Sequence, residues 1–232
     1  MLQHAQGVET SNQGNESGIG LLKILNMRVS KSNTKEVFRN VLKQYNLDQN
    51  DVSLIMESFD ELSLKKGDFF CKKGSYCPQL GILINGYLVA RYERYNNRKN
   101  DSEIITSRFY LMPELPRNLI VCDFNSFFNN EKSNENIIAE ENSQLVVISK
   151  DNLEKLYDKI PNMNRIGRIF AEQSYINAMD RIHILQSTGI EKIQHFLSEF
   201  RDVWKKAKIN DIASYLGMER SSLRKELKKI NK

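Results

Sequence analysis

Residues near the end of the chain combine hydroxyl groups with cations at a spacing that suits one face of a helix. Guanidinium and ammonium groups form charge-assisted hydrogen bonds to phosphate oxygens, and a hydroxyl adds a donor or an acceptor. Side chains of these types can together bind a polyanion, of which nucleic acid is the commonest. The candidate residues are Arg220, Ser221, Ser222, Arg224, Lys225 and Lys228.

The apolar residues of the same stretch predict how it folds. Leu223, Leu227 and Ile230 are spaced i, i+4, i+7 and therefore share one helical face. At roughly 100° per residue, Ser221 and the lysines fall on the opposite face, with Arg224 beside them. The pattern predicts an amphipathic helix, although an ordinary basic surface helix has the same pattern.

The distribution of charge favours the binding interpretation. Residues 201–232 hold ten Lys/Arg and four Asp/Glu, a net charge of +6, while the whole chain has 34 against 29, or +5. The first 200 residues therefore sum to −1, and the positive excess is confined to the C-terminal part. Such a field attracts a polyanion.

A second, shorter helix is expected just before this one. Residues 211–216 suit a short helix, and Gly217 can take the positive φ that a tight helix exit needs. A short helix, a glycine turn and an amphipathic helix are the parts of a helix-turn-helix, whose second helix enters the major groove of DNA.

The upstream chain predicts helices, then strands, then a long helix. Helical spacing is seen at about 34–47 and 49–60, and from Leu62 short β-prone runs alternate with turn residues. Asn85-Gly86, between ILI and YLVARY, predicts a two-residue β-hairpin. Many short strands with regular turns indicate an antiparallel barrel or sandwich.

A long helix is expected at about 162–186, after Pro161 ends a shorter one. Its residues Ile166, Ile169, Gln173 and Ile176 follow the 3-4-3 spacing of a coiled-coil seam. They predict either a dimer contact or packing on the barrel, and both alternatives stay open here. A further helix follows Gly189 and leads into the C-terminal motif.

Composition excludes several classes of protein. No apolar run is long enough for a membrane span, the N-terminus lacks the pattern of a secretory signal, and residues 1–20 are polar. Three cysteines favour a reducing cytoplasm over a disulfide framework. We see no metal-ligand pattern, phosphate-binding glycine loop or catalytic pair, so neither an enzyme nor a cofactor is expected.

The order of elements and three stretches of sequence resemble the CRP/FNR family of bacterial transcription regulators, and most of all its members common in Bacteroidetes. The stretches are LKKGDFFCKKGS with ILINGYL, then QLVVISKDNLEKL, then DIASYLGMERSSLRKEL. The resemblance implies an α+β fold: a cyclic-nucleotide-binding-like antiparallel β-roll, a long dimerisation helix and a C-terminal helix-turn-helix. The expected units are a flexible segment 1–30, an effector domain 31–160, a dimerisation helix 161–187 and a DNA-binding domain 188–232.

The resemblance also implies partners and roles. Arg220, Ser221 and Lys225 occupy base-reading positions, while Ser222 and the flanking Lys/Arg would hold phosphates. Double-stranded DNA and a second copy of the chain are the expected partners, RNA polymerase is a further candidate, and the effector is unknown. The alternative is a β-roll small-molecule sensor or protein-interaction module whose basic tail binds an acidic protein.

Several positions depart from the family's pattern. By ungapped counting, the family's Gly-Glu pair falls on Cys122-Asp123 and its Arg-Ser pair on Ser133-Asn134. No arginine remains in that loop to neutralise a cyclic phosphate, so we expect no tight cAMP binding. The family's N-terminal iron–sulfur cysteines and a haem-ligating histidine are lacking as well.

Three smaller expectations concern individual residues. Cys71, Cys77 and Cys122 could form a redox switch, or they could be ordinary buried thiols. Glu226 stands where the family has an apolar residue, and it could pair with Lys225 or Lys229 instead. We expect no β-hairpin wing after the recognition helix, since residue 232 follows it directly.

Overall fold

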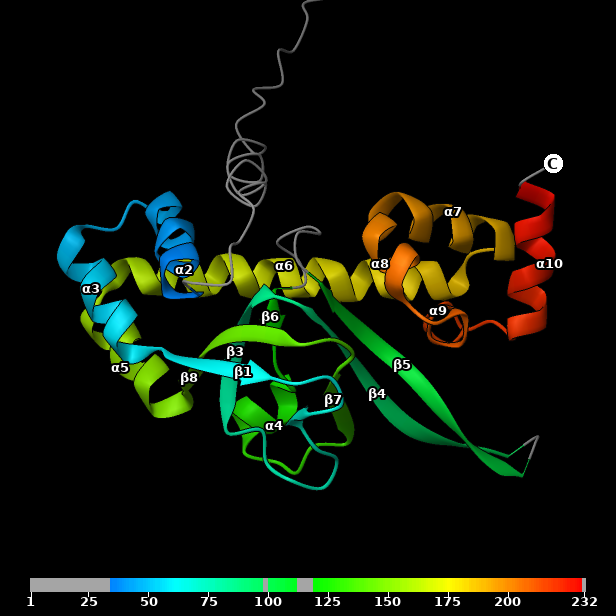
Figure 1. Ribbon diagram of the computed structural model, residues 1–232, viewed down its shortest axis with the longest axis horizontal. Helices are drawn as coiled ribbons and strands as arrows, with labels where there is room; N and C mark the ends of the chain where they lie inside the picture. Colours follow the sequence, from blue (N-terminus) through cyan, green and yellow to red (C-terminus); the bar gives the residue numbers. More distant parts are fainter. Residues whose placement is uncertain (1–33, 98–99, 112–118, 231–232) are drawn as a thin grey trace, which may run out of the picture.

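The computed structural model describes residues 34–97, 100–111 and 119–230, so the expectation for residues 1–30 lies outside it. A β-roll lies beneath the long helix α6 (Pro161–Gln186), with the helices of residues 34–58 and 150–159 at one end and those of residues 189–230 at the other (Figure 1). None of the described helices is long and apolar enough to cross a membrane.

The roll consists of two four-stranded antiparallel sheets, which confirms the predicted α+β fold with an antiparallel roll. The first sheet, in the order β1-β8-β3-β6, contains β1 (Asp60–Leu64), β3 (Gln79–Asn85), β6 (Ile120–Val121) and β8 (Ser143–Ser149). The second, in the order β2-β7-β4-β5, contains β2 (Phe69–Cys71), β4 (Tyr87–Asn96), β5 (Asp101–Leu111) and β7 (Glu135–Ala139).

The helices follow the predicted order. Those around the roll are α2 (Thr34–Leu42), continued by one 3₁₀ turn, α3 (Gln49–Ser58), α4 (Phe124–Asn129) and α5 (Lys150–Lys159). The long helix and the C-terminal helices are α6 (Pro161–Gln186), α7 (Gly189–Glu199), α8 (Arg201–Lys206), α9 (Ile209–Tyr215) and α10 (Arg220–Ile230). Pro161 begins α6, where its missing N–H costs nothing.

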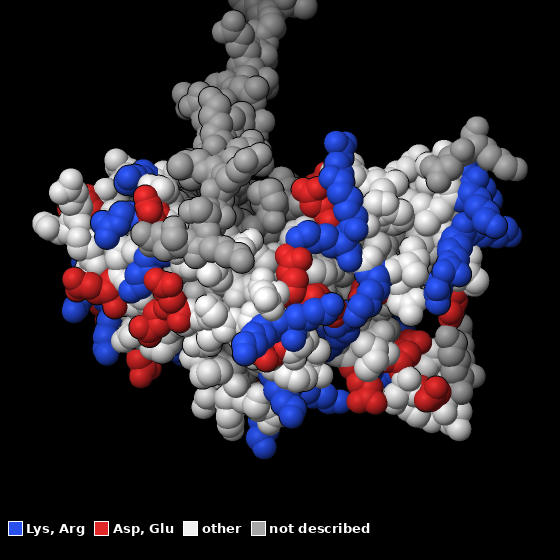
Figure 2. All heavy atoms as spheres, viewed as in Figure 1, with Lys and Arg blue, Asp and Glu red and all other residues white. Residues whose placement is uncertain are grey.

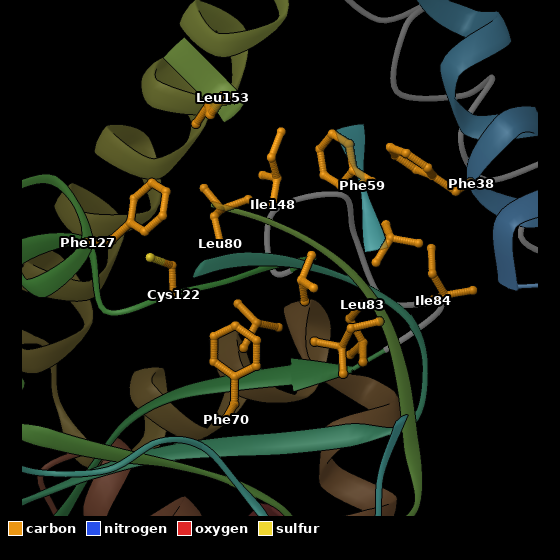
Figure 3. Close-up of a cluster of buried hydrophobic side chains, with 14 of the residues drawn as sticks. Phe38, Phe59, Phe70, Leu80, Leu83, Ile84, Cys122, Phe127, Ile148 and Leu153 are labelled. Atoms are coloured by element: carbon orange, nitrogen blue, oxygen red, sulfur yellow. The ribbon is translucent and has the colours of Figure 1, made fainter. Parts of the chain in front are cut away.

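The roll encloses one hydrophobic core that also ties down the helices around it. Figure 3 shows Phe38 of α2 and Phe59 next to roll residues such as Leu83 and Ile148. The rings of Phe38 and Phe59 lie 4.8 Å apart, and both are buried. Each such side chain contributes about 1.5–3 kcal/mol on burial, so the first helices are an integral part of the roll.

The chain segment at Asn85-Gly86 is not a hairpin, and this prediction was wrong. β3 pairs with β6 and β8 in one sheet, whereas β4 pairs with β5 and β7 in the other. Gly86 has a φ of +113°, and its backbone packs against Ser143. The glycine therefore allows the chain to turn from one sheet into the other. Such a turn requires a positive φ, as a tight hairpin turn does, so both are marked by a glycine in the sequence.

The first half of β4, residues 87–90, is buried on both faces, whereas the second half of the strand reaches the surface. Leu88 and Ala90 belong to the core of the roll, whereas Tyr87 and Val89 belong to a second hydrophobic core. The second core is completed by residues of α6, α7, α8, α9 and α10. The C-terminal helices are therefore packed on the outer face of the β4–β5 hairpin.

The long helix divides its apolar residues between these cores and its exposed surface. Ile166 packs in the roll core and Ile184 in the second core. Ile169 and Ile176 of the predicted seam remain 38% and 47% exposed. Packing on the roll accounts for only part of the seam, and the rest of it is an unpartnered apolar stripe on the described chain.

We expect Gly86→Ala to destabilise the fold strongly, because a Cβ at this position would lie 2.2 Å from Ser143 Oγ. Gly74→Ala is the matched control, since Gly74 also has a positive φ but no atom within 4 Å of an added Cβ. Both variants lose about 1–2 kcal/mol to backbone strain, and the steric clash adds about 1–3 kcal/mol at Gly86 alone. Urea unfolding measures both losses; equal losses would contradict the close approach.

Candidate nucleic-acid interface

All six predicted binding residues lie on α10, and all six are exposed. Figure 2 shows the Lys and Arg side chains of this helix as a continuous band at the C-terminal end of the molecule. The helix buries Leu223 completely and keeps Leu227 and Ile230 half-buried against its neighbours. The amphipathic division predicted from the sequence is therefore present, with the cations on the solvent side.

The turn between α9 and α10 has the predicted geometry. Gly217 takes a φ of +60°, and the backbone N–H of Met218 donates to the carbonyl of Ala213 at 2.9 Å. This 6→1 hydrogen bond is the helix-ending arrangement that a glycine exit supplies. The two helices and their turn thus have the form of a helix-turn-helix.

Glu226 lies at the edge of the apolar face of α10. Its carboxylate accepts from Lys229 Nζ at 2.8 Å, one of the two pairings that the sequence allowed. Glu226 is half-buried, and Gly189, the first residue of α7, faces its Cγ. The carboxylate is thus accommodated beside a glycine without displacing α10 from its packing.

A buried ion pair fixes α9, the helix that supports α10, to the β4–β5 hairpin. Arg91 of β4 donates from Nε and Nη2 to the two carboxylate oxygens of Asp211, both at 2.8 Å, and from Nη2 to Glu140 at 2.6 Å. Thr106 of β5 donates its hydroxyl to the same Asp211 at 3.1 Å. The three charged side chains are only 12–14% exposed, so the loss of one partner from this bidentate pair would strongly destabilise the fold.

The pKa values of two groups reflect this arrangement. Burial alone would raise the pKa of Glu140, but the hydrogen bonds and charges of Lys208 and Arg91 outweigh it and lower that pKa. Burial opposes the charged form of Arg91, and its carboxylate partners nevertheless raise its pKa. Arg91 and Glu140 are therefore both held in their ionised forms at neutral pH.

Two further contacts join α9 to the rest of the chain. The backbone N–H of Thr106 donates to Ser214 Oγ at 2.9 Å, and that hydroxyl donates to the carbonyl of Ile104 at 3.1 Å. From α6, Arg181 donates to the carbonyl of Tyr215 and lies 3.6 Å from the centroid of its ring. The docking of α9 on the β4–β5 hairpin was not predicted from the sequence. The available signal was Arg91, a charged residue that directly follows an apolar run in its strand.

The four candidate effector residues are placed close together, but three of them are buried. Asp123 caps the six-residue helix α4 by accepting from the N–H of Ser126, and Ser133 donates its hydroxyl to Asp123 at 2.6 Å. Cys122 is buried behind them, whereas Asn134 is exposed. A carboxylate thus occupies the helix N-terminus where a phosphate would otherwise be favoured.

The three cysteines are also buried as neighbours. The neighbouring Cys77 thiol and burial raise the pKa of Cys71, and the neighbouring Cys122 thiol and burial raise the pKa of Cys77 to about 12. Because the thiolate is the reactive species, such thiols react slowly with oxidants. The geometry favours the interpretation of buried packing residues over that of a redox switch.

No protein-family model and no curated protein matches the chain. Solved structures match it over most of its length. FixK2 from Bradyrhizobium japonicum has a TM-score of 0.58 at 14% identity, covering 75% of this chain and 84% of its own. The c-di-GMP-responsive global regulator CLP from Xanthomonas campestris has a TM-score of 0.58 at 16% identity, covering 79% and 92%.

A third match is a protein from Eubacterium rectale that is assigned to the CRP/FNR family of transcriptional regulators. Its TM-score is 0.57 at 16% identity, and the alignment covers 80% of this chain and 84% of that one. At these identities the likeness establishes the fold, which is the fold of CRP/FNR regulators. The likeness does not establish the Bacteroidetes-type subclass that the sequence motifs suggest.

We expect Arg91→Ala to lower the free energy of unfolding by about 3 kcal/mol, because it leaves two nearly buried carboxylates without their main partner. Arg94→Ala is the matched control: Arg94 lies three residues along the same strand and pairs with Glu103 at the surface. Its loss should stay below about 1 kcal/mol because water screens an exposed pair. Urea unfolding of both variants tests this, and equal losses would show that Arg91 does not fasten α9.

Proposed function

We propose that the chain is a sequence-specific DNA-binding transcription regulator that acts as a dimer. The observation that carries this proposal is α10, a helix that packs by Leu223 and presents Arg220, Ser221, Lys225 and Lys228 to solvent. A helix of this kind fits the major groove, where Arg and Lys bind guanine edges and phosphates. The fold that it shares with CRP/FNR regulators supports the same reading.

The roles of the individual side chains rest on the resemblance to the CRP/FNR family. Arg220, Ser221 and Lys225 occupy its base-reading positions, so we assign them to bases. Ser222, Arg224 and Lys228 are assigned to phosphates, which fix the register of the helix but carry no sequence information. RNA polymerase is a further proposed partner.

We assign the dimer contact to the exposed apolar stripe of α6. Ile169 and Ile176 are 38% and 47% exposed on this helix, although side chains of this kind are usually buried. Pairing α6 with a second copy would cover them and would present two α10 helices. Two recognition helices about 34 Å apart match successive turns of the major groove.

The effector domain, in this proposal, does not bind a cyclic nucleotide at Asp123 and Ser133. The buried Asp123 carboxylate occupies the N-terminus of α4, and a phosphate brought there would meet like charge. A calorimetric titration with cAMP should show no micromolar binding. Binding at micromolar or lower concentrations would contradict this part of the proposal.

DNA binding is tested by gel shift with genomic fragments in the presence of competitor DNA. Lys228→Ala should weaken binding to all fragments alike and reduce the slope of log K against log salt by about 1, since one phosphate contact is lost. Arg220→Ala should instead relax the sequence preference.

Lys155→Ala is the control for the DNA-binding variants, because Lys155 is exposed on α5, at the opposite end of the molecule from α10 (Figure 1). It should bind like the wild type. If the chain bound an acidic protein but no DNA fragment, the alternative function would be favoured. If Arg220→Ala kept the sequence preference of the wild type, the assignment of Arg220 to bases would be refuted.

Dimer formation is tested by sedimentation equilibrium of Ile176→Glu. A charge in the α6 stripe should convert the dimer into a monomer, because an unpaired charge is costly in an apolar contact. Ile104→Glu is the control, since Ile104 is an equally apolar residue that is 59% exposed on β5 and not on α6. A wild-type chain that sediments as a monomer would rule out the contact.

A further inference from the structure

An apolar cavity of about 300 Å³ lies near α2 and α5, at the end of the molecule opposite to α10 (Figure 1). Its walls come from α2, α5 and the first half of α6, and its floor comes from β3 and β6. Among the described residues that line it, none is charged, and only Tyr45, Tyr157 and Ser174 carry a polar group. Small-molecule sites usually place several polar groups to orient their ligand, so an apolar stretch of polypeptide suits this cavity better.

One side of α2 is buried outside the two hydrophobic cores. Val41 is only 7% exposed and lines the cavity, yet it belongs to neither core of the described chain. Thr34, seven residues earlier on the helix, is 5% exposed. Both amide atoms of Gln44 are buried without a hydrogen-bond partner, although a buried amide usually has one. This side of α2 is therefore a contact surface for a further part of the chain.

The sequence just before α2 contains a segment of matching chemistry. Residues 21–29, LLKILNMRV, hold six apolar residues, whereas residues 1–20 are mostly polar. The polar residues 30–33, SKSN, join this apolar segment to Thr34, where α2 begins. The change in composition marks residues 21–29 as a stretch that gains from leaving water.

The connection is long enough for this segment to reach the cavity. The five residues from Val29 to Thr34 span at most about 18 Å, and α2 rises about 10 Å from Thr34 to Val41. The segment can therefore turn back along α2 as far as the cavity. A tether this short also keeps its local concentration at about the millimolar level, so weak contacts suffice to hold it there.

We propose that residues 21–29 bind back onto α2 and fill this cavity, as an N-terminal strap at the end of the roll opposite to the C-terminal helices. The occupant is thus a part of the same chain, and neither a small molecule nor a second copy is needed. The strap requires no DNA, so the inference stands apart from the proposed function.

Limited trypsin digestion of the full chain tests whether the segment is docked, because Lys23 and Arg28 lie within it. Leu25→Asn should speed cleavage after these two residues about tenfold, since an amide is costly in an apolar cavity and a released segment is open to the protease. Val8→Asn, the same kind of change in the polar stretch, should leave the rate unchanged. Cleavage of the wild type as fast as that of Leu25→Asn would overturn the proposal.

A cross-link tests where the segment is docked. The three native cysteines are buried, so Asn26→Cys and Ala171→Cys add a pair of thiols for a short bismaleimide, and Ala171 is exposed where it lines the cavity. The link should form within one chain, and adding Leu25→Asn should slow it about tenfold because the released segment is no longer held beside α6.

Asn26→Cys with Ile104→Cys is the control for the cross-link, since Ile104 is exposed on β5 and does not line the cavity. This pair should not be linked within a chain. Links of equal yield to both positions would show that the segment has no fixed place, and links only between two chains would make a second copy the occupant. Either result would overturn the proposal.

Discussion

The β4–β5 hairpin is a wall shared by two hydrophobic cores, and the arrangement of the molecule depends on it. Successive side chains of a strand point to opposite faces, so Leu88 and Ala90 complete the roll while Tyr87 and Val89 complete the core beneath α7–α10. Phe109 of β5 contacts the rings of Phe196 and Tyr215. Detaching the C-terminal helices would expose several such side chains at about 1.5–3 kcal/mol each.

Polar contacts give that apolar interface a single register. A hydrophobic surface alone tolerates sliding, but a carboxylate as buried as Asp211 must meet the Arg91 guanidinium and the Thr106 hydroxyl together. Because Asp211 lies in the first turn of α9, its position sets where the following turn and α10 begin. The orientation of the cationic face of α10 is thus determined by residues of the roll, more than 100 positions earlier in the chain.

Helices and strands could be predicted from the sequence because they depend on the spacing of neighbouring residues. The packing of these elements on one another could not, because it depends on contacts between residues far apart in the chain. The amphipathic spacing of α10, the glycine exit at Gly217 and the order of helices and strands were all readable from spacing alone. The turn at Asn85-Gly86 was misread, since a positive φ is needed both in a hairpin and in a crossing between sheets. The pair of Arg91 with Asp211 was not predicted because these two residues lie 120 positions apart in the chain.

A cavity of about 520 Å³ borders the β5 strand of this wall, and the C-terminal helices close part of it. Part of the cavity comes from β5 and part from α7 and Tyr215, so undocking the C-terminal helices would remove one of its sides. A ligand can shift an equilibrium only by its difference in affinity between two states. A ligand that required both sides of this cavity would bind the docked state better, and it would therefore stabilise the arrangement in which Arg181 of α6 donates to the carbonyl of Tyr215 at the end of α9.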